Sequence, residues 1–315
     1  MAGQGILAAI TAPHRGPPHR IINGNAESRL EMRMKITESQ LGLLARKKMI
    51  VFDVDGTLAV PLHDASDNTV GLLLELARYK AVSIVTGNGV RKMEEQLLSP
   101  LVRLSGGDSW LLSKRFDAML LSGAERCCFR HGQWRVTQAD HIDKGDRETI
   151  VSIMKKAIKR VSGIPAPHIE DRKAQVTFLA CGTAAGPKDV DWDANGSKRK
   201  AMVEYLTEQM GRELPGKKFN VKVGGQISID VMMQDIDKAF ALRKLGNVSG
   251  IAVSDMAFIG DGLFPGGNDY AVLEDGLKLG VDAILVKGPK DTDALIKSLV
   301  GECARLGIKR LEKTD

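Results

Sequence analysis

Short apolar runs alternate with amphipathic stretches over most of the chain. Four runs, at residues 49–52, 81–85, 257–260 and 282–286, are apolar and contain β-branched side chains. Such runs are typical of strands that are buried on both faces of a parallel sheet. Helical patterns are expected in the segments between and after them, at residues 69–77, 90–98, 237–245 and 291–306. The alternation predicts a doubly wound α/β domain.

The middle of the chain follows a different pattern. A strand predicted at residues 117–122 leads to a hairpin around residues 131–133, and polar helices are expected at residues 147–161 and 197–210. Hairpin strands combined with polar helices are typical of an α+β layer. We therefore expect three parts, with hinges near residues 125–131 and 231–236: an N-terminal extension (1–47), a core (48–128 and 233–315) and an inserted α+β cap domain (129–232).

Two carboxylates follow the first predicted strand, where Asp53 and Asp55 precede Gly56. Ligands of open α/β sheets bind at the carboxyl ends of the strands. One carboxylate could attack an electrophile and bind a hard cation, while the other offers its backbone carbonyl and moves a proton. For an isolated Asp-x-Asp pair, a solvated turn is the alternative interpretation.

The second predicted strand also ends in residues that suit a phosphate. Thr86 and the backbone amides at Gly87 and Asn88 could hold a phosphate oxygen, although a hydroxyl at such a place is often only a helix cap. Further along the chain, the ammonium group of Lys238 could neutralise the charge of a phosphate and an aspartate. Taken alone, Lys238 would be an ordinary surface lysine.

Asp261 and Asp269 lie on either side of a turn-rich segment after the third predicted strand, and both are candidate metal ligands. The order of DVDGT, a strand ending in Thr86, Lys238 and GDG resembles the four motifs of the haloacid dehalogenase superfamily of phosphotransferases. The last third of the chain is similar to eukaryotic phosphomannomutases and their bacterial phosphatase relatives. These belong to the type IIB branch, which carries a large α+β cap.

This resemblance implies a doubly wound parallel-sheet (Rossmann-like) haloacid dehalogenase core with an inserted α+β cap. It implies Asp53 as the nucleophile that becomes an aspartyl phosphate and Asp55 as the general acid and base. Mg²⁺ would be held by Asp53, the Asp55 carbonyl and Asp261. Further roles are implied for Thr86 and Lys238, which would hold the phosphate, and for Asn268 and Asp269, which would support the metal.

The expected substrate-binding residues differ from those of the mutases, whose caps hold a second phosphate with several arginines. Arg172 stands where one of these arginines is expected, whereas Thr183 stands at the next. A third has no clear counterpart, although Lys188 and Arg199 are nearby in the sequence. The arginine that the mutases carry just after DGTL is also missing.

Ser228 and Asp230 match the pair that holds sugar hydroxyls in that family, but on a strand they could equally be ordinary edge residues. A mutase must bind a bisphosphate in both orientations and keep water off the aspartyl phosphate, whereas a phosphatase only has to admit water. Because arginines are missing, we favour a Mg²⁺-dependent phosphatase acting on a sugar phosphate or a similar small phosphomonoester. A phosphohexomutase and a non-catalytic binding protein are the alternatives.

The charge distribution and the cysteine content limit which binding partners and metal sites are expected. Residues 1–48 contain eight basic and three acidic residues, so most of the net charge of +6 precedes the first strand and no nucleic-acid surface is indicated. The four cysteines lack CxxC spacing, which argues against a disulfide framework or a zinc site. No apolar run is long enough to span a membrane. We expect a cytoplasmic enzyme. The resemblance also implies a homodimer, because related mutases pair through their caps.

The N-terminal segment, residues 1–30, has no core-forming pattern and is expected to be disordered. Arg15 and Arg20 would also suit an organelle transit peptide, and Met32 or Met34 could be the true start of the protein. A short helix is expected at residues 37–45.

Overall fold

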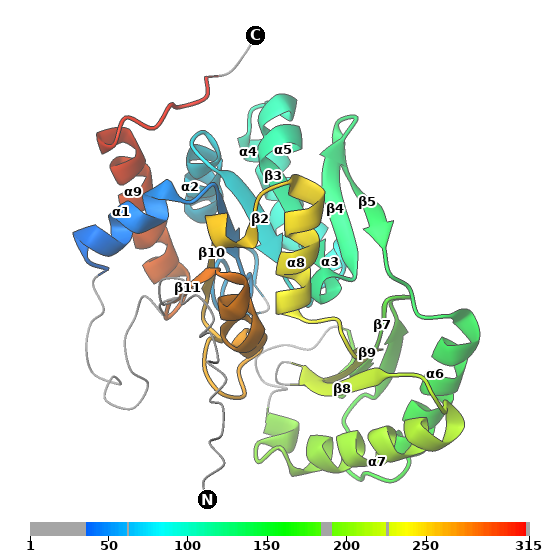
Figure 1. The fold of residues 1–315 in the computed structure, drawn as a ribbon. Helices are drawn as coiled ribbons and strands as arrows, with labels where there is room; N and C mark the ends of the chain where they lie inside the picture. The colour runs from blue at the N-terminus through cyan, green and yellow to red at the C-terminus, as the bar shows by residue number, and fades with distance from the viewer. Residues whose placement is uncertain (1–35, 62, 184–190, 225–226, 313–315) are drawn as a thin grey trace, which may run out of the picture.

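The computed structural model describes residues 36–61, 63–183, 191–224 and 227–312. Figure 1 shows two parts, a large sheet flanked by helices and a smaller sheet that is backed by two long helices. The segment predicted to be disordered, residues 1–30, and Lys188 lie outside the described ranges. The predicted α/β core and α+β cap are thus both present as distinct sheets.

Seven strands form the larger sheet: β1 Met49–Phe52, β2 Ala81–Val85, β3 Phe116–Leu120, β4 Glu125–Arg130, β5 Gln133–Ala139, β10 Met256–Gly260 and β11 Asp282–Leu285. Their order in space is β11-β10-β1-β2-β3-β4-β5. The pairs from β11 to β3 are parallel, and β4 and β5 add an antiparallel hairpin at one edge. The sheet confirms the predicted doubly wound core.

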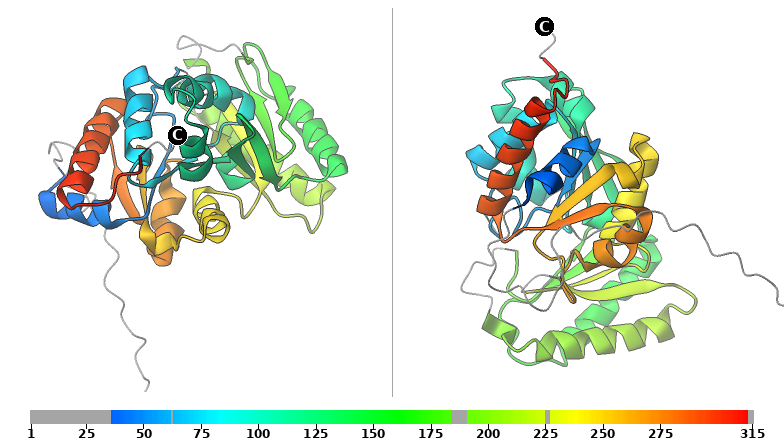
Figure 2. Two further views of the ribbon diagram at one scale, coloured as in Figure 1. Left: turned by 90° about the horizontal axis from the view of Figure 1, so that it is seen from above. Right: turned by 60° about the vertical axis from the view of Figure 1, so that its left-hand side comes forward.

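Helices cover both faces of this sheet, as Figure 2 shows. One face carries α1 Glu38–Arg46, α2 Asp67–Ala77, α3 Val90–Met93, α4 Ser99–Leu104, α5 Ser109–Arg115 and α9 Pro289–Arg305, and the other carries α8 Lys238–Ser249. Shorter turns are η1 Glu94–Leu98, η2 Leu121–Gly123, η4 Val253–Asp255, η5 Val272–Gly276 and η6 Leu277–Leu279. Each face of the sheet has its own apolar core. Side chains alternate along β1, so Ile50 and Phe52 pack under the helices of the first face, whereas Met49 and Val51 pack on the face that carries α8.

The predicted helices agree with the structure except near their ends. The short helix expected at residues 37–45 is α1, which begins with a capping box between Thr37 and Gln40. The helix expected at residues 90–98 changes to a π-helical turn at Glu94–Leu98 and continues into α4. No helix in the described ranges is long and apolar enough to cross a membrane.

The smaller layer is an antiparallel sheet with the order β6-β7-β9-β8, made of β6 His168–Asp171, β7 Gln175–Leu179, β8 Phe219–Gly224 and β9 Ser228–Met233. Two helices, α6 Lys144–Ile158 and α7 Ser197–Glu213, cover one face and share an apolar core with it. Because side chains alternate along a strand, Glu170, Thr177 and Asp230, which are in register, lie on the other face. The cap sheet therefore has one apolar and one polar face.

The cap boundary expected at residue 129 falls inside β4. That strand and β5 pair with the larger sheet, so by sheet pairing the cap begins after Ala139. Trp134 fixes β5 there, because its indole packs edge-on against Phe129 and its Nε1 donates a hydrogen bond to Leu98 O at 3.1 Å. The sequence placed this hairpin in the cap because hairpin strands combined with polar helices are typical of an α+β layer.

Candidate active site

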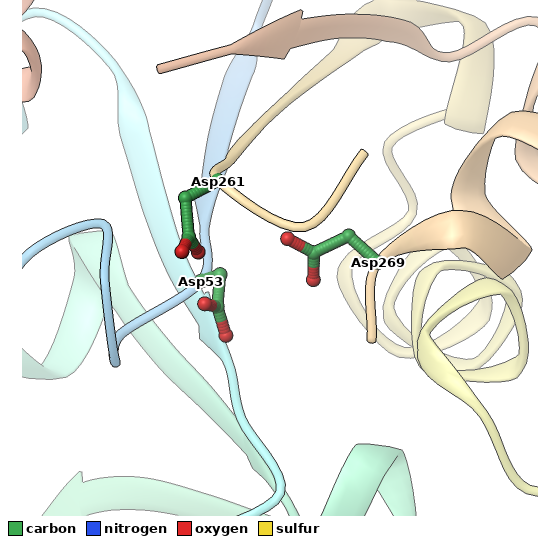
Figure 3. Close-up of side chains that lie close together, drawn as sticks. All are labelled: Asp53, Asp261 and Asp269. Carbon is green, nitrogen blue, oxygen red and sulfur yellow. The ribbon is translucent and has the colours of Figure 1, made fainter. Parts of the chain in front are cut away.

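The carboxyl ends of β1 and β10 bring three carboxylates together (Figure 3). Asp53 follows β1, Asp261 follows β10, and Asp269 comes from the loop beyond Asp261. One oxygen of each lies within 4.8 Å of the others. The two strands pair in parallel, and the backbone N–H of Asp53 donates to Ile259 O at 2.9 Å, so the sheet itself fixes the first two side chains.

Lys238, the first residue of α8, lies between two of these carboxylates. Its Nζ is 2.5 Å from Asp53 Oδ1 and also donates to Asp269 Oδ1, and all three side chains are almost fully buried. Burial raises the pKa of Asp53 to about 7; the charge of Lys238 opposes this shift and the charge of Asp269 adds to it. Burial lowers the pKa of Lys238, but the charges of Asp269 and Asp53 outweigh it and keep the ammonium group protonated.

The donor set fits a hard divalent cation. Asp53 Oδ2 is buried and has no hydrogen-bond partner in the described ranges, and Asp261 lies beside it with Oδ1 accepting from Thr57 Oγ1 at 3.1 Å. Carboxylate oxygens are the ligands that Mg²⁺ prefers. Both oxygens of Asp269 are already engaged, one by Lys238 and the other by the Gly262 N–H at 3.0 Å. This arrangement favours Asp53 and Asp261 as ligands and Asp269 as their support.

Gly56 permits the close approach of the β1 and β10 loops. Its φ is +85°, and a Cβ at this position would lie only 2.1 Å from Asp261 Oδ2. A side chain would therefore be strained and would displace a candidate metal ligand. Asn268 packs in the same way against Gly262, where an added Cβ would meet its Oδ1 at 2.0 Å.

The carboxylate of Asp55 is held by two amide side chains. Asn88 Nδ2 donates to Asp55 Oδ2 at 2.7 Å, and Gln96 Nε2 donates to Asp55 Oδ1 at 2.9 Å. The side chain of Asn88 thus contacts the predicted general acid, and the phosphate contact predicted for its backbone amide stays a prediction. Gln96 was not predicted. In the sequence, Gln96 is only a polar residue next to Leu97 and Leu98, and such a residue alone indicates no catalytic role.

Thr86 lies at the end of β2, beside the strand that delivers Asp53. Its side chain is buried and accepts from the Asn88 N–H at 3.1 Å, which shapes the turn containing Gly87. The pairing of Phe52 with Ile84 places Asp53 and Thr86 at the same edge of the sheet. This position is compatible with the phosphate contact predicted for Thr86, which stays a prediction.

The polar face of the cap reaches the core at this edge. A Cβ on Gly89 would lie 3.9 Å from Arg172 Cδ, and Arg172 Nη2 donates to Glu170 Oε2 at 2.8 Å. Asp230 Oδ1 accepts from Thr177 Oγ1 at 2.8 Å, and burial raises the pKa of Asp230. Arg172 and Asp230 are therefore both held by neighbours on the cap sheet.

The remaining cap candidates are held by neighbouring residues or are exposed, and the sugar contact predicted for Ser228 stays a prediction. Ser228 Oγ donates to Gly224 O at 2.6 Å, at the end of the cap sheet. Arg199 Nε donates to Asp193 Oδ2 at 3.0 Å, and Asp193 also caps the first turn of α7. Thr183 is exposed. Sequence reasoning missed Gln175, a buried cap residue whose Oε1 has no hydrogen-bond partner in the described ranges.

A family profile described as eukaryotic phosphomannomutase matches residues 70–302, well over half of the chain. The chain belongs to the eukaryotic phosphomannomutase family. A Caenorhabditis elegans relative named "Probable phosphomannomutase" is 27% identical over 81% of this chain and 96% of its own length. Human "Phosphomannomutase 1" is 25% identical over 79% of this chain and 91% of its own. Members of the phosphomannomutase family thus match both the core and the cap.

The solved structures support the fold. The ATP-bound IMP-nucleotidase of Plasmodium falciparum aligns with a TM-score of 0.64 and 17% identity, covering 88% of this chain and 66% of that chain. Together with the phosphomannomutase family match, this confirms the predicted membership of the haloacid dehalogenase superfamily. The protein is a phosphoryl-transfer enzyme of that superfamily.

Proposed function

We propose that the protein is a Mg²⁺-dependent phosphatase that hydrolyses a sugar phosphate or a similar small phosphomonoester through an aspartyl phosphate on Asp53. The observation that carries the phosphoryl transfer is the arrangement of Asp53. One oxygen is neutralised by Lys238, while the other is buried beside Asp261 without a hydrogen-bond partner in the described ranges. A carboxylate held in this way can bind a cation through one oxygen and attack phosphorus with the other.

The side chains divide the chemistry between them. Asp53 attacks the phosphorus atom, and the bond to the leaving oxygen breaks while Asp55 gives that oxygen a proton. Water then attacks the aspartyl phosphate, Asp55 takes a proton from it, and inorganic phosphate leaves Asp53. Lys238 and Thr86 hold the phosphoryl oxygens. Mg²⁺ bound by Asp53, Asp261 and the Asp55 carbonyl would supply charge neutralisation at the transferring group.

The charges on the cap favour hydrolysis over mutase action. A second phosphate would bring close to two negative charges and would need several cations. In the described part of the cap, Arg172 is paired with Glu170 and lies near the carboxylate of Asp230, and Arg199 is held by Asp193. Acidic and polar groups of this kind suit hydroxyls better than a second phosphate.

A phosphohexomutase is the second candidate, because the curated relatives are named phosphomannomutases. Such an enzyme would use Asp53 in the same way but would return the phosphoryl group to a second hydroxyl. It would need further cations around the second phosphate, and Lys222, which is in register with Asp230 on the cap sheet, is one described candidate. The two functions therefore share the core site and differ in the cap.

A panel of sugar phosphates assayed with Mg²⁺ for release of inorganic phosphate tests the proposal. We expect release without any bisphosphate activator. Interconversion of hexose 1- and 6-phosphates that needs a hexose bisphosphate, with little phosphate release, would replace the phosphatase by the mutase. Neither activity on any member of the panel would support the non-catalytic alternative.

Arg172→Ala is expected to raise KM for the preferred sugar phosphate about 10- to 100-fold, because a charge-assisted hydrogen bond contributes about 1.5–3 kcal/mol. KM for 4-nitrophenyl phosphate should change little, because an aryl group does not offer sugar hydroxyls. Arg103→Ala, which removes an exposed arginine paired with Asp67 on the core, is the matched control. An equal rise in KM for both substrates would remove the cap from substrate recognition.

A further inference from the structure

Asp55 belongs to a closed ring of hydrogen bonds with two amide side chains. Asn88 Nδ2 donates to Asp55 Oδ2 at 2.7 Å and to Gln96 Oε1 at 3.3 Å, and Gln96 Nε2 donates to Asp55 Oδ1 at 2.9 Å. Each carboxylate oxygen thus accepts from a different residue. Two donors on separate oxygens fix the plane of the carboxylate as well as its position.

Gln96 is the residue that ties this ring to the rest of the core. Its Nε2 also donates to His63 O at 3.0 Å, and its backbone carbonyl accepts from the Ala65 N–H at 3.0 Å. Nε2 faces an oxygen of Asp55 and a backbone carbonyl oxygen, and Oε1 accepts from Asn88, so turning the amide over would place an oxygen against two oxygens. Gln96 therefore clamps the loop that follows Asp55 through its side chain and its backbone together.

The local helix explains how Gln96 reaches this place. Residues Glu94–Leu98 form a π-helical turn between α3 and α4, and π-helical turns occur frequently at functional sites. Gln96 is fully buried within it, between apolar neighbours of the core. Burying an amide is unfavourable unless its hydrogen bonds are satisfied, and here each polar atom of the side chain has a partner.

We infer that Gln96 is a positioning residue that holds the Asp55 carboxyl in line with the leaving oxygen. The inference rests on the proposed function, in which Asp55 gives a proton to that oxygen as the bond from phosphorus to it breaks and the bond from Asp53 to phosphorus forms. Asp55 later takes a proton from the attacking water. Gln96 touches no reacting atom and acts only through Asp55.

The test compares kcat/KM for two substrates, because this ratio reports the first transfer to Asp53. A sugar phosphate has a poor leaving group that needs a proton, whereas 4-nitrophenyl phosphate has a good one that does not. Gln96→Met keeps the length of the side chain but removes its donors. We expect it to lower kcat/KM for the sugar phosphate about 10- to 100-fold, as loss of an outer-shell partner does elsewhere, and to leave the aryl phosphate nearly unchanged.

A double-mutant cycle with Asp55→Asn separates positioning from general damage. If Gln96 acts through Asp55, Gln96→Met should have little further effect in the Asp55→Asn background. Leu98→Met, a volume-conserving change in the same turn, is the matched control and should keep full activity. Asn88→Ala removes the other donor to Asp55 and provides a second variant if Gln96→Met does not fold.

Equal losses on both substrates, or a full additional loss in the Asp55→Asn background, would overturn the positioning role and leave the phosphatase proposal intact. A wild-type protein that interconverts hexose phosphates without hydrolysing them would overturn the proposed function. The same cycle, measured on the interconversion rate, would then decide the role of Gln96. A wild-type protein active in neither assay would overturn both.

Discussion

Asp53→Asn is expected to reduce phosphate release by at least about 10⁴-fold, because it removes the only atoms that form the covalent intermediate. The amide nitrogen or oxygen of asparagine cannot replace the buried carboxylate oxygen that lies free beside Asp261. Phosphate release from the preferred sugar phosphate with Mg²⁺ measures the effect. Retention of substantial activity would assign the nucleophile to another residue.

The same variant should be more stable than the wild type when metal is removed with a chelator. The pKa of Asp53 is raised from 3.8 to about 7, so the folded protein holds this proton more tightly than the unfolded chain. Wild-type stability should therefore fall as pH rises from about 4 to about 7, and the advantage of the variant should grow over the same range. Thermal unfolding at pH 4 and pH 8 gives the comparison, and it also shows that an inactive variant is folded.

Mg²⁺ provides the internal control for that comparison. A cation that binds the folded wild type at Asp53 raises its Tm by mass action, and it should raise the Tm of the variant less. A variant that is less stable than the wild type at pH 8 without metal would show that the Asp53 charge stabilises the fold. That result would contradict the conclusion that burial disfavours the ionised form of Asp53.

The residues at the ends of the core strands could be predicted from the sequence because two independent signals coincide there. An apolar strand followed by a glycine turn places Asp53 and Asp261 at one edge of a parallel sheet, whatever the family. The order of the motifs then adds Lys238, which is distant from both in the chain. Local patterns can find such residues because the sheet edge, not side-chain packing, decides where they meet.

The contacts within the loops could not be predicted in the same way. That the Asn88 side chain turns to Asp55 depends on side-chain geometry that no periodicity records. Gln96 is one polar residue in a helical pattern, and such a residue is usually on a solvated face. It is buried within a π-helical turn, which no periodicity in the sequence indicates.

The domain boundary was displaced for a similar reason. The strand that contains Trp134 exposes most of its side chains, so its composition resembles that of the cap. The strand belongs to the larger sheet because it pairs with β4, which in turn pairs with β3, and its buried indole packs against Phe129 and donates to Leu98 O. Backbone pairing of this kind is not visible in the composition of the strand.

Lys238→Met is expected to affect stability and catalysis together. In metal-free protein near pH 8, it should lower the free energy of unfolding by about 3–5 kcal/mol, because removing one partner of a buried ion pair leaves uncompensated charge. Asp53 and Asp269 would then face each other without the ammonium group that now contacts both. The loss should shrink at acidic pH, where Asp53 can take up a proton, and denaturant unfolding at two pH values measures it.

The same change should lower kcat about 10²- to 10³-fold even with saturating Mg²⁺, since a preorganised positive group at the transferring phosphoryl is lost. Lys278→Met, which removes an exposed lysine paired with Asp275, is the matched control and should cost less than about 1 kcal/mol with no change in kcat. The loss of stability and the loss of kcat in Lys238→Met are to be compared with each other. If Lys238→Met were unstable but kept wild-type kcat once folded with Mg²⁺, Lys238 would serve only to neutralise the buried carboxylates, and the cation alone would account for phosphate activation.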